Sequence, residues 1–129
     1  MRYRHPKENI EFEIADTWIA AAGVIGFVPT QPAFLATADP NWPTILVPIS
    51  TVRAPWRNTG VIGLHEDRTV ALLRAYAGRT PVPPLEVHTP PGQARYDVRD
   101  GYHRYFTSIA MGFTMLPVSV RPYFDINAC

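Results

Sequence analysis

Cysteine is nearly absent from this chain of 129 residues, and its one copy, Cys129, is the last residue. A single cysteine cannot form a disulfide within the chain, which favours a reducing compartment such as the cytoplasm. The net charge of +1 gives no overall electrostatic attraction to nucleic acid or to anionic lipid. Binding of an anion would therefore have to come from a local site.

Long hydrophobic runs are also missing. The most apolar stretch, WIAAAGVIGFV, is little more than half as long as the ~20 residues that a helix needs to cross a bilayer. The charged start of the chain has no apolar signal core, so we expect a cytoplasmic protein that does not contact a membrane. The four histidines lack zinc-ligand spacing and no metal site is predicted. No P-loop, dinucleotide fingerprint or Ser-His-Asp pattern is present either.

Proline, in contrast, is abundant, with 14 residues grouped in segments such as DPNWPTILVP and TPVPPLEVHTPP. Proline fixes φ and disfavours helix for the residue before it, so these segments predict turns and entries into extended chain. Apolar residues make up 47% of the chain and charged residues 18%, a composition typical of one globular domain.

Hydrophobic periodicity predicts a small α/β (α+β) domain with a mixed sheet. The expected elements alternate along the chain: a strand over 44–50, a helix over 65–78, strands over 83–89 and 94–100, a helix over 102–112, and a strand over 115–120. Upstream, residues 8–15 alternate like a half-buried strand, and Asp16 is expected to cap a helix that starts at Thr17. We expect residues 1–43 to form an N-terminal extension packed on a core domain of residues 44–129.

The stretch RDGYHRYF lies where a predicted strand gives way to a predicted helix. Gly101 lacks a side chain, so another group can approach the backbone there. The N–H groups and dipole of a first helical turn attract anions, and Arg104 could add a bidentate contact to phosphate. His103 is a further donor when protonated. An alternative interpretation is structural, with Asp100 as the helix cap and Arg104 in a surface ion pair.

The helix after this turn carries apolar residues at helical spacing, which predict one buried face: Tyr102, Phe106, Ile109, Ala110 and Phe113. Its polar residues are expected on much of the remaining surface: His103, Arg104, Thr107 and Ser108.

The helix over 65–78 opens with HED, where Glu66 or Asp67 could act as a general base or hold Mg²⁺, and His65 could reach a ligand. Acidic residues in a first turn also simply complement the helix dipole.

The segment VRDGYHRYFTSIAMGFTMLPVSV resembles the C-terminal motif of the ParB/sulfiredoxin superfamily: Asp-Gly-x-x-Arg, a helix with small residues, then Leu-Pro-Val. Upstream, ILVPISTVRA resembles that family's opening strand and loop, and HEDRTVALLRAYAGRTPVPPLEV resembles its helix and the strand that follows. The resemblance covers about residues 44–121. It implies a ParB/sulfiredoxin-like fold whose Gly-x-x-Arg turn binds nucleotide phosphates. In this superfamily sulfiredoxins use ATP, ParB proteins bind CTP, and a related free-serine kinase uses ADP.

The resemblance implies a pocket for the phosphates of ATP or CTP, with Mg²⁺ as a candidate companion. Its expected nucleotide-binding residues are Asp100, Gly101, Tyr102, His103, Arg104 and His65. For an enzyme, the expected catalytic residues are His103, which would neutralise charge with Arg104, and Glu66 or Asp67, which would orient a nucleophile or metal. Hydrolysis and phosphoryl transfer both stay open as reactions.

Two departures from the family narrow the function. Sulfiredoxins carry a nucleophilic cysteine where this chain has Tyr102, so sulfinic-acid reduction is not supported. The sequence ends soon after Arg121 and gives no support for a ParB-type DNA clamp.

Two alternative functions remain. One is a nucleic-acid-binding protein or nuclease, in which Arg53 and Arg57 would meet phosphate and Trp56 would stack on a base. The other is a degenerate protein-interaction module, with which a homodimer would be consistent.

Overall fold

A five-stranded mixed sheet forms one side of the molecule, in the strand order β3-β7-β5-β6-β4. The computed structural model describes residues 1–55 and 63–123, and Trp56, Arg57 and Cys129 lie outside them. The strands are β3 (Thr44–Pro48), β4 (Val52–Arg53), β5 (Leu85–His88), β6 (Tyr96–Asp100) and β7 (Met115–Val120). β7 runs antiparallel to β3 and parallel to β5, whereas β6 runs antiparallel to β5 and parallel to β4. The predicted α/β fold class with a mixed sheet is confirmed.

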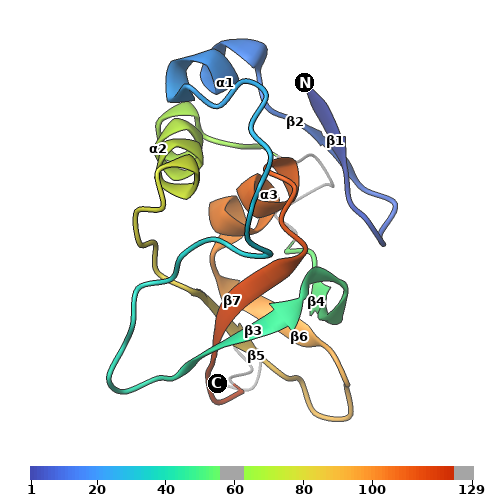
Figure 1. Ribbon diagram of the computed structural model, residues 1–129. Coiled ribbons are helices and arrows are strands. Elements are labelled where there is room, and N and C mark those ends of the chain that lie inside the picture. Colours follow the sequence, from blue (N-terminus) through green and yellow to red (C-terminus); the bar gives the residue numbers. More distant parts are fainter. Residues whose placement is uncertain (56–62, 124–129) are drawn as a thin grey trace.

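Three α-helices and an N-terminal hairpin complete the described fold. The helices are α1 (Asp16–Ala22), α2 (Glu66–Ala77) and α3 (Tyr102–Ala110), and a 3-10 turn (Ile49–Thr51) precedes β4. The hairpin consists of β1 (Arg2–Arg4) and β2 (Glu11–Glu13). α3 lies between α2 and the hairpin, above the sheet (Figure 1). Within the described ranges, no helix combines the length and the apolar character that a membrane span requires.

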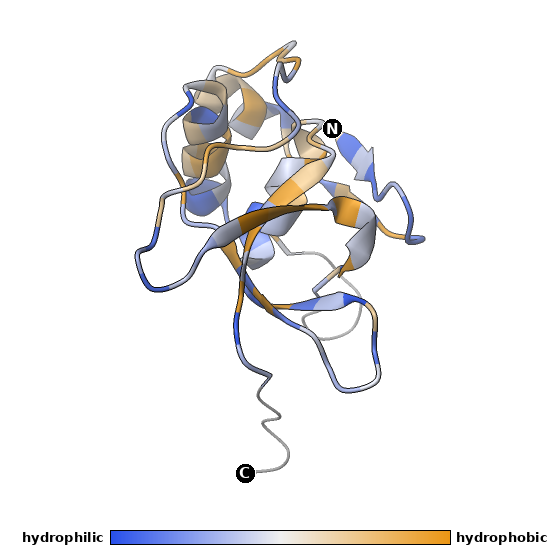
Figure 2. Cartoon of the chain, turned by 60° about the horizontal axis from the view of Figure 1, so that its bottom comes forward, coloured by the Kyte–Doolittle hydropathy of each residue, from blue (hydrophilic) through white to orange (hydrophobic). Residues whose placement is uncertain are grey.

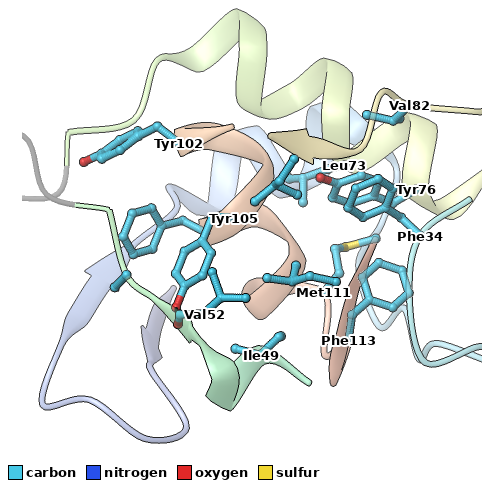
Figure 3. Packing of buried hydrophobic residues seen from close by; sticks show 14 of the residues in the cluster. Phe34, Ile49, Val52, Leu73, Tyr76, Val82, Tyr102, Tyr105, Met111 and Phe113 are labelled. Atoms are coloured by element: carbon cyan, nitrogen blue, oxygen red, sulfur yellow. Dashed lines mark hydrogen bonds between the residues drawn. The ribbon is translucent and has the colours of Figure 1, made fainter. Parts of the chain in front are cut away.

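α3 is the central element of the core. The prediction that its polar residues occupy a surface is wrong for His103, Thr107 and Ser108, which are buried with 8%, 0% and 0% of their surface exposed. The reason is that α2, the hairpin and the sheet cover α3 from different directions (Figure 1). Thr107 satisfies its hydroxyl inside the helix, 2.6 Å from the carbonyl oxygen of His103. Tyr105, which the periodicity missed, is fully buried near Val52 (Figure 3).

The other helices and strands follow the predicted order with local differences. α2 shows alternating hydrophilic and hydrophobic bands, as expected of a helix with one face on the core (Figure 2). Asp16 does not cap α1, because the helix begins at Asp16 itself and Ala15 is the cap residue. The strand expected over 8–15 is shorter and pairs with β1, while Arg53, expected in a loop, lies on β4.

The N-terminal hairpin is fixed to α3 by apolar packing and by one buried histidine. Phe12 of β2 lies edge-on to Phe106 of α3, with ring centroids 5.1 Å apart. Ile10, Phe12 and Ile14 are buried, as the alternating pattern predicts. The hairpin and the residues beside it therefore contribute side chains to the same hydrophobic cluster as the sheet.

His5 supplies the polar part of this attachment. Its Nδ1 accepts the backbone N–H groups of Lys7 and Glu8 at 3.0 and 2.8 Å, so Nδ1 carries no proton. The neutral ring must then carry its proton on Nε2, which donates to the hydroxyl of Tyr105. That hydroxyl in turn donates to the carbonyl oxygen of Val52 at 3.3 Å. One chain of hydrogen bonds thus connects the hairpin, α3 and β4.

The turn from β6 to α3 depends on a glycine. Gly101 has φ of +127°, a conformation that residues with a side chain rarely adopt. A Cβ at this position would lie 2.7 Å from Cγ of Leu85, which is fully buried in β5. The space left by the missing side chain is therefore filled by Leu85 on that side.

We predict that Gly101→Ala destabilises the protein by about 3 kcal/mol or more, since backbone strain adds to a core clash. Gly26→Ala is the matched control, because Gly26 also has positive φ (+74°) but nothing lies within 4 Å of its added Cβ. It should cost about 1 kcal/mol from strain alone. Urea unfolding followed by circular dichroism measures both, and equal losses would contradict the close approach of Leu85.

Because His5 is buried as a neutral ring, we predict that the free energy of unfolding depends on pH. Burial lowers the pKa of His5 in the folded state, so the unfolded chain takes up a proton that the folded chain resists. Stability is therefore expected to be fully present above about pH 6.5 and to fall as the pH decreases below it. His5→Gln should flatten this part of the pH dependence in urea unfolding. If the stability of His5→Gln depends on pH as strongly as that of the wild type, His5 is not the neutral buried group inferred here.

Candidate functional site

A pocket of about 360 Å³ opens at the junction of β6 and α3. Most of the sequence-predicted nucleotide-binding residues line it. Arg68 of α2 and an apolar wall from α2 and from residues 82–83, which precede β5, complete the lining. The lining residues are Arg68, Ala71, Leu72, Val82, Pro83, Asp100, Gly101, Tyr102, His103 and Arg104. Because the pocket lies at the N-terminus of α3, the positive end of the helix dipole contributes to its potential.

Arg104 forms one wall of this pocket and is held in place by the protein. Its Nη1 donates to the carbonyl oxygens of Pro83 and Pro84 at 3.0 and 2.8 Å. Its Nη2 lies 3.1 Å from Oδ2 of Asp100, and the arginine side chain is 15% exposed. The ion pair of the structural interpretation is thus present, but Asp100 does not cap α3, whose cap residue is Gly101. A guanidinium has five N–H donors, so these contacts leave donors for a ligand.

His103 joins the start of α3 to the start of α2. Its Nε2 accepts the backbone N–H of His65 at 2.9 Å. Because a backbone amide can only donate, Nε2 carries no proton in this arrangement, and a neutral ring has its proton on Nδ1. A doubly protonated His103, as the sequence analysis envisaged for a donor, would have to give up this bond. His65 thus reaches the pocket wall through its backbone.

Tyr76 fixes the first turn of α3 from the side of α2. Its hydroxyl lies 3.2 Å from the carbonyl oxygen of Arg104 and 3.1 Å from Oγ1 of Thr107. The ring stacks on Phe34 with centroids 4.8 Å apart, as Figure 3 shows. Burial raises the pKa of Tyr76 to about 12, so its hydroxyl keeps its proton at physiological pH. The pocket wall is therefore held by hydrogen bonds from three directions.

The acidic residues predicted to act in catalysis lie next to the pocket without lining it. Glu66 and Asp67 lie in the exposed first turn of α2, two residues and one residue before Arg68, respectively. The part of the chain that the structure describes contains no group of three or more His, Cys, Asp or Glu side chains able to hold a metal ion. Asp100 is the carboxylate that lines the pocket, and it faces Arg104.

Arg68 is the charged residue of the pocket that the sequence analysis did not assign to the site. It lies one turn into α2, exposed to solvent, and has no hydrogen bond or ion pair with another residue in the described ranges. In the sequence it directly follows the HED segment, where a charged residue is usually a solvent-exposed residue of the helix surface. The packing of α2 against α3 could have identified it, but no local pattern in the sequence does.

No protein-family model matches the chain, and no curated protein matches it. Among solved structures, free serine kinase in complex with AMP is similar, with a TM-score of 0.52 and 18% sequence identity over 77% of this chain. A mutant of that enzyme in complex with AMP has a TM-score of 0.53, and the same mutant in complex with ADP has 0.52. This chain covers 37% of the length of the AMP-bound kinase. At this identity the similarity concerns the fold of a nucleotide-binding enzyme.

Proposed function

We propose that the pocket at the β6–α3 junction binds a nucleotide through its phosphates. The observation that carries the proposal is the convergence of Arg68 and Arg104 on one pocket at the N-terminus of α3. Two guanidinium groups and the positive end of a helix dipole together favour an anion with several charged oxygens. The fold supports this, because similar structures of free serine kinase hold AMP or ADP.

The proposed contacts assign different parts of the ligand to different walls. Arg104 would approach the phosphates with a guanidinium already oriented by Pro83 and Pro84. Arg68, which has no described partner, would turn toward the phosphates when the ligand binds. The apolar wall from Leu72 and Val82 offers a surface for the sugar or base. In these assignments the phosphates lie between Arg68 and Arg104, and the less polar part of the nucleotide lies against Leu72 and Val82.

A phosphotransferase of the ParB/sulfiredoxin superfamily is the finer form of this proposal. In such a reaction the protein contributes positioning and neutralisation of charge, which Arg68 and Arg104 would supply. His103 would orient the pocket, and Glu66 or Asp67 would act on a nucleophile or Mg²⁺ brought in with the phosphates. Mg²⁺ commonly binds through one or two carboxylates and the phosphates of the substrate. Asp100 is therefore a candidate ligand, because its carboxylate lines the pocket.

Arg68→Gln tests the proposal without disturbing the fold, because Arg68 is exposed and has no described partner. We expect the variant to bind ADP about tenfold more weakly, as the loss of one charge-assisted contact predicts. Thermal-shift titration with ATP, ADP, AMP and CTP, with and without Mg²⁺, measures this. A ligand at ~100 times its Kd adds roughly 2.7 kcal/mol of stability to the wild type.

Arg2→Gln is the matched control, because Arg2 is an exposed arginine of the hairpin with a 3.9 Å contact to Glu13. Its nucleotide affinity should equal that of the wild type. If none of the four nucleotides stabilises the wild type, the proposal is wrong. If a nucleotide stabilises wild type and Arg68→Gln equally, the ligand binds elsewhere. Arg104→Ala is a weaker test, since loss of its bonds to two carbonyl groups would also destabilise the protein.

A further inference from the structure

The edge strand β4 turns an arginine away from the core. Val52 is 2% exposed, whereas the next residue, Arg53, is exposed, as expected from the alternation of side chains along a strand. Arg53 pairs in register with Asp97 of the parallel strand β6. Paired residues of neighbouring strands project from the same face of a sheet, so these two side chains leave the sheet side by side.

Two further cations lie around Arg53. Arg95 approaches from the start of β6, where its Nε lies 3.1 Å from Oδ1 of Asp97. Lys7 comes from the tip of the N-terminal hairpin and donates to the carbonyl oxygen of Ser50 at 3.2 Å. Three segments that are distant in the sequence thus bring positive charges to one edge of the sheet.

These residues enclose two adjoining hollows of about 250 and 220 Å³ that share Arg53. We refer to both together as the Arg53 cleft. Its lining residues are Lys7, Glu8, Ser50, Val52, Arg53, Ala54, Pro55, Arg95, Asp97 and Val98. The combined space suits a small molecule or one end of a larger one.

The two carboxylates of the Arg53 cleft are already engaged by the protein. Glu8 accepts the backbone N–H of Ala54 at 2.8 Å and lies 3.6 Å from Nε2 of His5. Asp97 is paired with Arg95. Arg53, in contrast, forms no hydrogen bond or ion pair with any residue in the described ranges. Three cations and two carboxylates leave the cleft with one excess positive charge, and Arg53 is the group that carries it.

We propose that the Arg53 cleft binds the carboxylate group of a small molecule. A carboxylate matches both the geometry of a guanidinium and the single excess charge. A phosphate dianion fits less well, because Glu8 and Asp97 would repel its second charge. Arg53 would bind the carboxylate directly, and Lys7 and Arg95 would stabilise it from either side.

The Arg53 cleft and the β6–α3 pocket lie along one strand. Asp97 lines the first and Asp100 the second, and three residues of extended chain span ~10 Å. Binding of the carboxylate does not itself require the nucleotide, so the two proposals can fail separately.

Titration with L-lactate and with lactamide tests the proposal, since lactamide has nearly the same shape and no charge. Lactate should shift the backbone amide NMR signals of Arg53, Ala54, Asp97 and Val98 in the wild-type protein. Lactamide should not shift them. Arg53→Gln should weaken lactate binding by about tenfold or more, because the direct charge-assisted contact is lost. Sodium chloride at equal ionic strength controls for nonspecific screening.

Arg2→Gln is again the matched control and should bind lactate like the wild type. Equal effects of lactate and lactamide, shifts confined to other residues, or undiminished binding in Arg53→Gln would each overturn the proposal. ADP titration of Arg53→Gln separates the two sites. Retained ADP binding with lost lactate binding supports both proposals. Lactate binding in a protein that binds no nucleotide supports the Arg53 cleft and rejects the proposed function.

Discussion

The fixed first turn of α3 is the constraint on which the rest of the structure depends. Three segments reach this turn: the carbonyl groups before β5 through Arg104, the start of α2 through His103, and the end of α2 through Tyr76. Because these bonds join elements that are distant in the sequence, the turn cannot move without disturbing the sheet and α2 together. A ligand that binds there meets a wall that is already ordered, which lowers the entropic cost of binding.

The same bonds explain why a structural role for the Asp-Gly-x-x-Arg turn does not exclude a role in binding. Arg104 is a structural residue, since it forms an ion pair and satisfies two carbonyl groups. It also lines a pocket that its remaining donors can serve. Gly101 likewise has a packing role through Leu85 while its backbone faces the pocket. A pocket built from residues that also hold the fold together has the same geometry with and without a ligand.

The order of the core elements and their main faces could be predicted from the sequence, because each depends on short-range periodicity. Leu85 and Val87 alternate with Glu86 and His88 as expected, and β5 buries the first pair. The burial of Thr107 and Ser108 could not be predicted, since it depends on α3 being covered from several sides. A polar residue looks the same in a sequence whether it faces water or another helix.

The candidate sites show a similar division. The Asp-Gly-x-x-Arg turn is contiguous, so the sequence indicated Asp100 through Arg104 together. Arg68 enters the same pocket from another helix, and the Arg53 cleft is assembled from the hairpin, β4 and β6. Such groupings arise from tertiary contacts between segments, which one sequence does not reveal. The hairpin therefore contributes side chains to a surface cleft as well as to the core, because Lys7 and Glu8 line the Arg53 cleft.

The abundant proline has a further consequence at the borders of the sheet. β3 is an outer strand with Pro43 before it and Pro48 at its end, and β4, the opposite outer strand, is two residues long with Pro55 shortly after it. A proline has no N–H to donate to an incoming strand. Each edge strand therefore offers another chain only a few backbone groups for strand pairing. Short edge strands of this kind disfavour edge-to-edge aggregation.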